Sequence, residues 1–322
     1  MKNILITSAG QRVSLVKAFQ NEAKKMSSDL KVYTVDLNPI LAPGCLISDG
    51  YEQIVHVNDD YYISNLLEVC LRFNIGMIIP TIDTELLKLS MNKYLFEAKN
   101  IKIIVGSNEF IKKCRDKRLT NIFFKDNGIE IPKTISKINP TFPLFIKPYD
   151  GSLSKDIDLI QKESELKEHH FSNEKLMFME YIDPKYFYEY TIDAYYDKNH
   201  ELKCAVPRKR IFVRSGEINK GVTHKNEIVD FVSQKLKNIP GAIGCITIQV
   251  FFNPETKVII GIEINPRFGG GFPLSYLAGA NYPLWLIQEY LDSQEIPFFK
   301  DWKNNLLMLR YDAEILMENY EQ

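Results

Sequence analysis

The sequence has no large excess of charge of either sign and no long hydrophobic run. Its 322 residues include 40 Lys and Arg against 41 Asp and Glu, a formal net charge of −1 at pH 7. Such a balance gives no overall basic field to hold nucleic acid or an anionic membrane surface. No apolar stretch approaches the roughly 20 residues that a membrane-spanning helix needs. We therefore expect neither nucleic acid nor a membrane among the partners.

Several common site motifs are also lacking. The five cysteines are scattered and form no CxxC pair, which predicts reduced thiols in a cytoplasmic protein. The phosphate-binding Walker A pattern does not occur in the chain. The first turn reads TSAGQR and holds only Gly10, where a dinucleotide site needs GxGxxG. The acidic Asp36 after the second strand pattern is therefore not enough to predict a nicotinamide site.

The first third of the chain alternates between strand and helix patterns. Short β-branched runs at 3–7, 31–35, 76–80 and 102–106 are each followed by turn residues, and amphipathic helical patterns lie at 11–25 and 61–73. This alternation predicts an α/β, Rossmann-like domain with an open parallel sheet over residues 1–107. Its ligand edge is expected at the carboxyl ends of the strands, in the turns at 8–12, 36–39 and 81–83.

The second part of the chain has a different pattern. After a predicted helix at 108–126, strand patterns follow one another at 143–147, 156–160, 176–181, 188–196, 202–206, 244–252 and 257–264. Residues 188–196 alternate as a half-exposed antiparallel strand does. We predict an α+β domain over 108–322, with one lobe at about 130–185 and a second at about 186–300.

Oxygen-bearing side chains gather on the predicted hairpin at 244–267. Apolar residues form one face of both strands, so Gln249 falls on the opposite face with Glu263 and Asn265. We expect Gln249 to lie across from Gly261 and diagonal to Glu263. Carboxylate and amide oxygens are ligands that Mg²⁺ prefers, and Arg267 beyond them suits a phosphate. On this spacing alone, a solvated polar sheet face remains an equal alternative.

Further groups that attract anions lie upstream. Lys117 falls within the predicted helix at 108–126, and Lys147 ends a strand that runs into the Gly/Ser-containing loop at 151–155. A lysine followed by such a loop can place an ammonium and backbone N–H groups around phosphate oxygens. The apolar strand at 176–181 leads into Ile182 and can offer backbone groups to an adenine edge. Together these residues favour a nucleotide site.

In this order, the two lysines, the MEYI and EYTID segments, Gln249 and the EINPR motif at 263–267 resemble the ATP-grasp superfamily. The resemblance covers nearly the whole chain and is closest to proteins similar to the carbamoyl-phosphate synthetase large subunit. It implies an α/β domain that precedes the ATP-grasp module, followed by a two-lobed α+β ATP-grasp domain. ATP would lie between the two lobes.

The resemblance also implies a role for each matched position. The ATP-binding residues would be Lys117 and Lys147 at the phosphates, Gly151, Ser152 and Ser154 in a loop that closes over them, Glu180, Tyr181 and Ile182 at adenine, and Glu189 at the ribose. The metal ligands would be Gln249, Glu263 and Asn265. They would hold Mg²⁺, expected as two ions, with Mn²⁺ as an alternative. Arg267 would stabilise charge on the transferring phosphoryl group.

The expected activity is that of an ATP-grasp ligase, which joins a carboxylate to an amine through an acyl phosphate and forms ADP. The basic segment at 205–226 adds Arg208, Arg210 and Arg214 as candidate anion-binding residues, with a solvated charged hairpin as the alternative. We expect small-molecule carboxylate and amine substrates, and a homodimer remains open. A phosphotransferase and a nucleotide-binding protein without catalysis are the two alternative functions.

Overall fold

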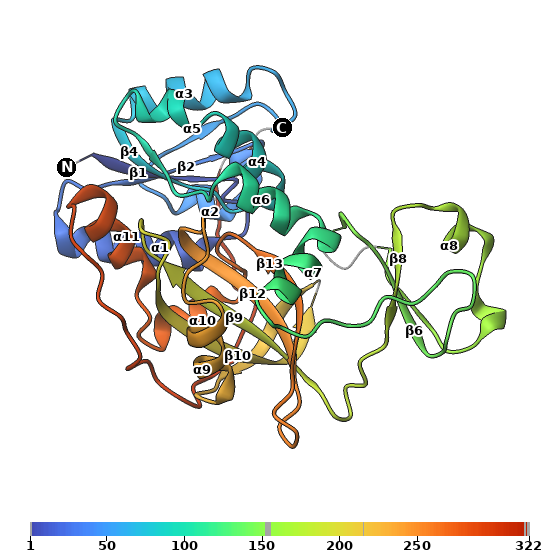
Figure 1. Cartoon of the computed structure of the whole chain (residues 1–322). Coiled ribbons are helices and arrows are strands. Elements are labelled where there is room, and N and C mark those ends of the chain that lie inside the picture. The colour runs from blue at the N-terminus through green and yellow to red at the C-terminus, as the bar shows by residue number, and fades with distance from the viewer. Residues whose placement is uncertain (1, 152–155, 215, 319, 321–322) are drawn as a thin grey trace.

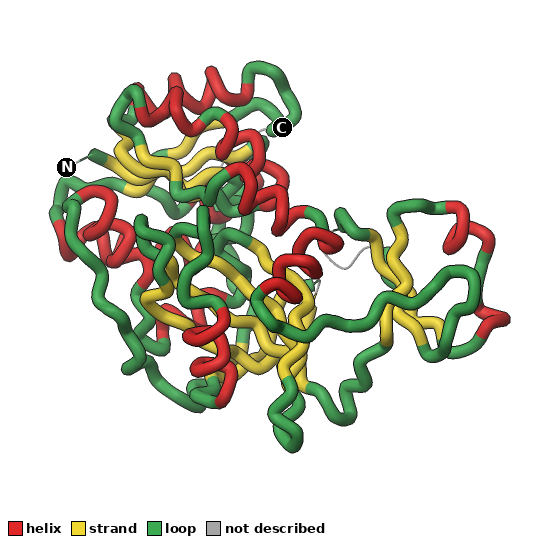
Figure 2. Tube along the Cα trace, in the orientation of Figure 1, coloured by secondary structure: helices red, strands yellow, loops and turns green. Residues whose placement is uncertain are grey.

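The computed structural model describes the chain except residues 1, 152–155, 215, 319 and 321–322. Its strands form three separate groups, one near the N-terminus, one large central sheet and one small sheet that stands apart (Figure 2). In the part described, no helix is both long enough and apolar enough to span a membrane.

The N-terminal sheet is open and parallel, as predicted. Its strands are β1 (Asn3–Thr7), β2 (Val32–Asp36), β3 (Tyr51–Gln53), β4 (Ile75–Ile79) and β5 (Lys102–Ile103), in the order β3-β2-β1-β4-β5. The helices of this region are α1 (Val13–Met26), α2 (Pro43–Leu46), α3 (Tyr62–Arg72), α4 (Asp83–Met91) and α5 (Lys93–Glu97), with a 3₁₀ turn η1 (Pro39–Leu41). All five residues of β4 are buried because helices cover both faces of the sheet (Figure 1).

The strand order of this sheet reverses between β1 and β4, where ligand-binding crevices form in open α/β sheets. The turns after these two strands are tied together, since Thr81 Oγ1 donates to the Ser8 carbonyl at 2.8 Å. The buried Glu85 carboxylate accepts from the Ser8 hydroxyl and from the Thr81 N–H. Asp36 at the end of β2 accepts from the Gly10 N–H at 2.9 Å, so this carboxylate holds the turn that follows β1.

The single helix predicted at 108–126 is wrong, because two helices occupy this range. They are α6 (Asn108–Arg115) and α7 (Lys117–Asp126). Asp116 between them has an extended backbone, with φ −103° and ψ 113°, and its side chain caps α7 by accepting from the Arg118 N–H. The break places Lys117 at the first residue of α7 and not in the middle of a helix.

The small sheet is a lobe with its own core. It consists of β6 (Leu144–Pro148), β7 (Asp158–Ile160) and β8 (Leu176–Glu180) in the antiparallel order β7-β6-β8, with η2 (Glu163–Glu165) and α8 (Glu168–Ser172) beside it. Buried Leu144, Ile146 and Phe178 pack together there. Figure 1 shows this lobe, hereafter the lid, projecting from the rest of the molecule beyond α7.

The central sheet carries six strands in the order β13-β12-β9-β10-β11-β14. They are β9 (Tyr188–Tyr196), β10 (Leu202–Arg214), β11 (Glu217–Thr223), β12 (Gly244–Phe252), β13 (Ile259–Asn265) and β14 (Leu307–Leu309). The accompanying helices are α9 (Glu227–Lys235), α10 (Phe272–Leu277) and α11 (Tyr282–Leu291). The prediction of a half-exposed strand at 188–196 is wrong, because β9 is an interior strand and is buried from Tyr190 to Tyr196.

One hydrophobic core joins the N-terminal sheet to the central sheet. It brings Val16 and Phe19 of α1 together with Phe268, Phe272 and Leu286. The rings of Phe19 and Phe268 meet edge to face, with centroids 5.9 Å apart. These two regions are therefore one packed body, from which the lid stands apart. The domain boundary at 107 and the lobe limits at about 130–185 and 186–300 stay predictions.

Candidate active site

A cleft of about 520 Å³ lies where the lid, the central sheet and the N-terminal region meet. Most of the site residues expected from the sequence line it. These are Lys117, Lys147, Gly151, Glu180, Tyr181, Ile182, Glu189, Arg208, Arg210, Gln249, Glu263, Asn265 and Arg267. Ser152 and Ser154, which were expected in the closing loop, lie outside the described residues.

Gln249, Glu263 and Asn265 form an oxygen-bearing patch, and they lie closer together than the expected strand register predicts. Gln249 lies directly opposite Glu263 and not Gly261, because the ladder between β12 and β13 shifts at Gln249/Val250. Glu263 Oε1 accepts from Gln249 Nε2 at 2.8 Å and from Asn265 Nδ2 at 2.9 Å. Three side chains that carry oxygen atoms therefore meet in the cleft, with the amide N–H groups of Gln249 and Asn265 turned toward the Glu263 carboxylate. This donor set suits a hard cation such as Mg²⁺.

Two lysines face this patch. Lys117 Nζ lies 3.9 Å from Glu263 Oε2 and donates to the Gly151 carbonyl at 2.6 Å, so it joins the central sheet to the lid. Lys147 lies in β6 of the lid. Burial lowers the pKa of its ammonium to about 8, although the nearby Glu263 opposes the shift. The lowered pKa means that the negative charge near Lys147 does not offset the cost of burying its ammonium. A bound phosphate would supply further negative charge.

The lid side of the cleft is mostly apolar. Phe145, Met179 and Ile182 line it, together with Ile262 from β13. Glu180 at the end of β8 is fixed by the segment that enters the lid, since its N–H donates to the Lys133 carbonyl and its carboxylate accepts from the Lys133 N–H. An apolar slot beside the end of a strand suits a flat aromatic base. The adenine role of residues 180–182 nevertheless stays a prediction.

Glu189 and Arg210 form an ion pair within the cleft. Arg210 Nη1 donates to Glu189 Oε1 at 2.7 Å and to Gln249 Oε1 at 3.2 Å, which links this pair to the oxygen-bearing patch. Burial raises the pKa of Glu189, and Arg210 opposes that shift. Arg210 is thus placed beside the expected phosphates. The ribose role of Glu189 stays a prediction.

The other two arginines of the basic segment lie in different surroundings. Arg208 is 1% exposed and pairs with buried Asp193, its Nη2 donating to Asp193 Oδ1 at 2.9 Å. Its Nη1 makes no hydrogen bond within the described part of the chain. Arg214 pairs with Asp312 at the exposed end of the hairpin and does not line the cleft. We therefore do not retain Arg214 as a site residue.

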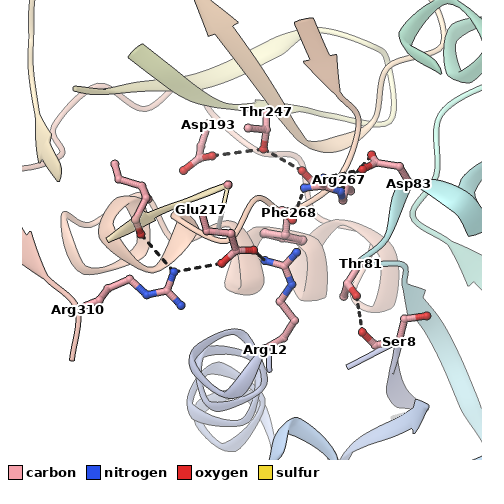
Figure 3. Close-up of polar contacts among 12 residues, drawn as sticks. Ser8, Arg12, Thr81, Asp83, Asp193, Glu217, Thr247, Arg267, Phe268 and Arg310 are labelled. Carbon is pink, nitrogen blue, oxygen red and sulfur yellow. Dashed lines mark hydrogen bonds and ion pairs between the residues drawn. The ribbon is translucent and has the colours of Figure 1, made fainter. Parts of the chain in front are cut away.

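Arg267 meets the N-terminal region. Its Nη2 donates to Asp83 Oδ2 at 2.6 Å and its Nε to Asp83 Oδ1 at 3.1 Å, a two-point contact shown in Figure 3. Arg12 and Glu217 also line this end of the cleft, and neither they nor Asp83 were predicted as site residues. The available signal was the position of Arg12 and Asp83 after β1 and β4, at the expected ligand edge.

The glycines of residues 269–271 leave room for charged side chains. A Cβ on Gly270 would lie 2.1 Å from Cδ of Glu217, and a Cβ on Gly271 would lie 2.0 Å from Nη1 of Arg208. Any larger residue would displace one of these groups. At this end of the cleft, the Glu217 carboxylate therefore packs against Gly270 and the Arg208 guanidinium packs against Gly271.

Two family models match the chain. The model described as "PylC-like, N-terminal domain" matches residues 4–104, and that described as "ATP-grasp in the biosynthetic pathway with Ter operon" matches residues 172–308. No curated protein sequence matches this chain. The matches fall on the N-terminal sheet and on the region from the end of the lid through the central sheet.

Solved structures share the fold at low sequence identity. The biotin carboxylase domain of Hydrogenobacter thermophilus 2-oxoglutarate carboxylase has a TM-score of 0.70 at 14% identity, over 95% of this chain and 73% of that one. The L-amino acid ligase of Bacillus licheniformis has a TM-score of 0.65 at 16% identity, over 90% and 74%. Rhizobium etli pyruvate carboxylase has a TM-score of 0.70 at 12% identity, over 95% of this chain but only 30% of that much longer one.

The fold and the cleft are those expected of a nucleotide-binding enzyme, with the cleft between a lid and a central antiparallel sheet. Together with the family matches, they confirm the resemblance inferred from the sequence. Residues 172–308 match an ATP-grasp family model, and the chain shares the fold of solved enzymes that include an L-amino acid ligase.

Proposed function

We propose that this protein is an ATP- and Mg²⁺-dependent ligase that joins a small carboxylate to an amine. The observation that carries the proposal is the arrangement of charge in the cleft. Lys117 and Lys147 face Glu263 and its amide neighbours, and charged groups from the N-terminal region close the far end. A triphosphate suits the first part of this cleft, and a second substrate suits the far end.

Two of the similar structures support this reading. The biotin carboxylase domain from Hydrogenobacter thermophilus was solved with MgADP and bicarbonate, and the Bacillus licheniformis protein is named an L-amino acid ligase. Both share the fold of this chain.

The proposed reaction has two steps. First, a carboxylate oxygen of the substrate attacks the γ-phosphorus of ATP, the bond from that phosphorus to the β-γ bridging oxygen breaks, and ADP leaves. Second, the amine nitrogen attacks the carbonyl carbon of the acyl phosphate, phosphate leaves with the C–O bond electrons, and the nitrogen loses a proton. The products are an amide, ADP and phosphate. The protein mainly positions the reactants and stabilises charge.

Glu263 and Asn265, helped by Gln249, would hold Mg²⁺. The donor set fits because Glu263 Oε2 has only the 3.9 Å contact with Lys117 among the described residues. The bound ion would neutralise phosphate charge and orient the γ-phosphate. We leave the number of ions at the two that the sequence predicts, with Mn²⁺ as an alternative.

The cations around this patch have distinct tasks in the proposal. Lys117 and Lys147 bind phosphate oxygens from two sides. Arg267, fixed by its two contacts with Asp83, stabilises charge on the phosphoryl group during transfer. Arg208 offers its Nη1, which has no hydrogen-bond partner among the described residues, to an anion beside Gly271. The planar guanidinium groups of Arg267 and Arg208 suit these two roles, because a guanidinium stays charged and can bind an anion at two points.

The test is a screen of carboxylate and amine pools with ATP and Mg²⁺, with ADP release and product mass both measured. We expect a condensed product one water lighter than the sum of the two substrates, with one ADP per amide. Glu263→Gln should reduce turnover by about a hundredfold or more, since it removes the charged metal ligand. Glu255→Gln is the matched control, because Glu255 lies exposed in the turn between β12 and β13.

Each other outcome points to a different function. A stable phosphorylated product without an amide would identify a phosphotransferase. ATP binding with no ADP formation from any substrate pair would leave a nucleotide-binding protein without catalysis. Equal turnover by Glu263→Gln and the unaltered protein would show that the oxygen-bearing patch does not hold the metal.

A further inference from the structure

Three distant parts of the chain place charged groups together at the far end of the cleft (Figure 3). Arg12 follows β1, Glu217 begins β11, and Arg310 follows β14. Arg12 Nη1 lies 3.3 Å from Glu217 Oε1, and Arg310 Nη1 lies 3.2 Å from Glu217 Oε2. Each arginine therefore holds a different oxygen of the same carboxylate.

Only two of these three groups line the cleft. Arg12 and Glu217 do, with side chains 19% and 38% exposed, whereas Arg310 is not among the lining residues. Arg310 also donates to the Ile218 carbonyl, so it anchors Glu217 from behind. The Arg12–Glu217 ion pair spans 3.3 Å, and neither group has been used in the proposed phosphoryl transfer.

The backbone is shaped to keep Glu217 in this position. Its carboxylate lies against Gly270, where an added Cβ would come within 2.1 to 2.3 Å of all three of its terminal atoms. On the N-terminal side, buried Glu85 and Thr81 fix the turn that leads to Arg12. The two opposite charges are thus held on rigid supports, side by side, beyond the expected γ-phosphate.

On the basis of the proposed function, we infer that Arg12 and Glu217 bind the amine substrate, and that this substrate is a zwitterion such as an α-amino acid. Its ammonium lies on Glu217 Oε1 and its carboxylate on Arg12. A ligand with both charges replaces the Arg12–Glu217 ion pair and leaves each protein group paired. Such an exchange avoids burying an unpaired charge, which is costly in a partly buried site.

Ligands with only one charge fit less well. A simple amine would pair with Glu217 and leave the Arg12 guanidinium without its partner. A simple carboxylate would pair with Arg12 and meet repulsion from Glu217. Arg310 leaves Glu217 anchored in both cases, so the carboxylate cannot leave without losing a second ion pair. The charge pattern therefore selects for both groups on the same molecule.

The first experiment measures binding without turnover. Calorimetry with a non-hydrolysable ATP analogue and Mg²⁺ compares the proteinogenic L-amino acids with their carboxamides and their decarboxylated amines. We expect at least one free amino acid to bind at least tenfold more tightly than both of its derivatives, because each derivative loses a charge-assisted contact worth roughly tenfold to a hundredfold. The same panel is then used as amine substrates.

Substitutions test the two contacts separately. Arg12→Gln should weaken the free amino acid by about tenfold or more yet leave its carboxamide nearly unchanged, since the amide has no carboxylate to lose. Glu217→Gln should weaken both. Gly270→Ala should act like Glu217→Gln, because it displaces the carboxylate without removing its charge. Arg72→Gln is the control, since Arg72 pairs with Glu52 on the surface of the same region.

The outcomes separate this inference from the proposed function. Equal binding of free amino acids, carboxamides and simple amines, or no binding by any of them, overturns the inference even if amides form. Selective amino acid binding that Arg12→Gln abolishes supports it even if no amide is found, in which case only the ligase proposal fails. Unchanged binding of the ATP analogue by the variants shows that their folds are intact.

Discussion

The lowered pKa of Lys147 predicts how ATP binding depends on pH. This lysine of β6 is partly buried beside the oxygen-bearing patch, and burial lowers its pKa from 10.5 to about 8. Only the ammonium form attracts phosphate. The free protein holds that form below pH 8 and loses it as the pH rises through 8. If Lys147 binds the phosphates as proposed, bound ATP surrounds it with negative charge and raises its pKa again, so above pH 8 binding requires the uptake of a proton.

The size of the effect follows from the difference between the pKa of Lys147 in the free protein and its higher pKa in the ATP-bound protein. With a pKa of about 8 in the free protein, the protonated fraction of Lys147 falls from roughly nine tenths at pH 7 to one tenth at pH 9. The apparent affinity for ATP should therefore fall by roughly tenfold over this range, which corresponds to about 1.4 kcal/mol. As the pH rises further, the affinity for ATP should stop falling only near the pKa of Lys147 in the ATP-bound protein.

Calorimetric titration of the protein with a non-hydrolysable ATP analogue at several pH values, at constant Mg²⁺ and ionic strength, tests this prediction. Lys147→Arg is the control, because a guanidinium stays charged throughout the range and should bind with little pH dependence. Lys147→Met should bind weakly at every pH. A flat profile for the unaltered protein, or the same decline in Lys147→Arg, would refute the argument.

Two stability predictions follow from the packing around the site. Arg208→Met should lower the free energy of unfolding by about 3–5 kcal/mol, because it leaves the Asp193 carboxylate buried without its partner. Adding Asp193→Asn should recover part of the loss, and a single-variant loss below about 1 kcal/mol in chemical denaturation would contradict this reasoning. Gly261→Ala should cost about 1–3 kcal/mol, since its Cβ would lie 2.6 Å from the buried Phe124 ring. An unchanged denaturation midpoint for Gly261→Ala would show that the ring can move aside.

The nucleotide end of the site was predictable because its residues are marked by local patterns. Period-two alternation assigned Gln249, Glu263 and Asn265 to one face of a hairpin, and this face does line the cleft. What the pattern missed was the ladder irregularity that sets Gln249 directly opposite Glu263. A bulge depends on how both strands pack against their neighbours, so alternation within one strand carries no sign of it. The same limit explains the helix break at Asp116, where a capping side chain interrupts a continuous apolar pattern.

The far end of the cleft was not predictable in the same way. Arg267 meets Asp83 across 184 residues of sequence, and Glu217 lies between arginines from opposite ends of the chain. The position of Arg12 and Asp83 in turns at the expected ligand edge was the only local signal, and it does not indicate which side chains they meet. Their positions follow from the shared core that packs α1 against the central sheet, which only the folded chain reveals.

This difference between the two ends has a physical basis in how the site is supported. Lys147, Gly151 and residues 180–182 belong to the lid, which has a small core of its own. Arg12, Asp83, Glu217 and Arg267 belong to the body, in which one continuous core joins the N-terminal sheet to the central sheet. A displacement of the lid would therefore change the surroundings of Lys147 and leave the charge pairs at the far end intact. Under the proposed function, selectivity for the second substrate would therefore depend on the body alone, whereas nucleotide binding would depend on both the lid and the residues of the central sheet that face it.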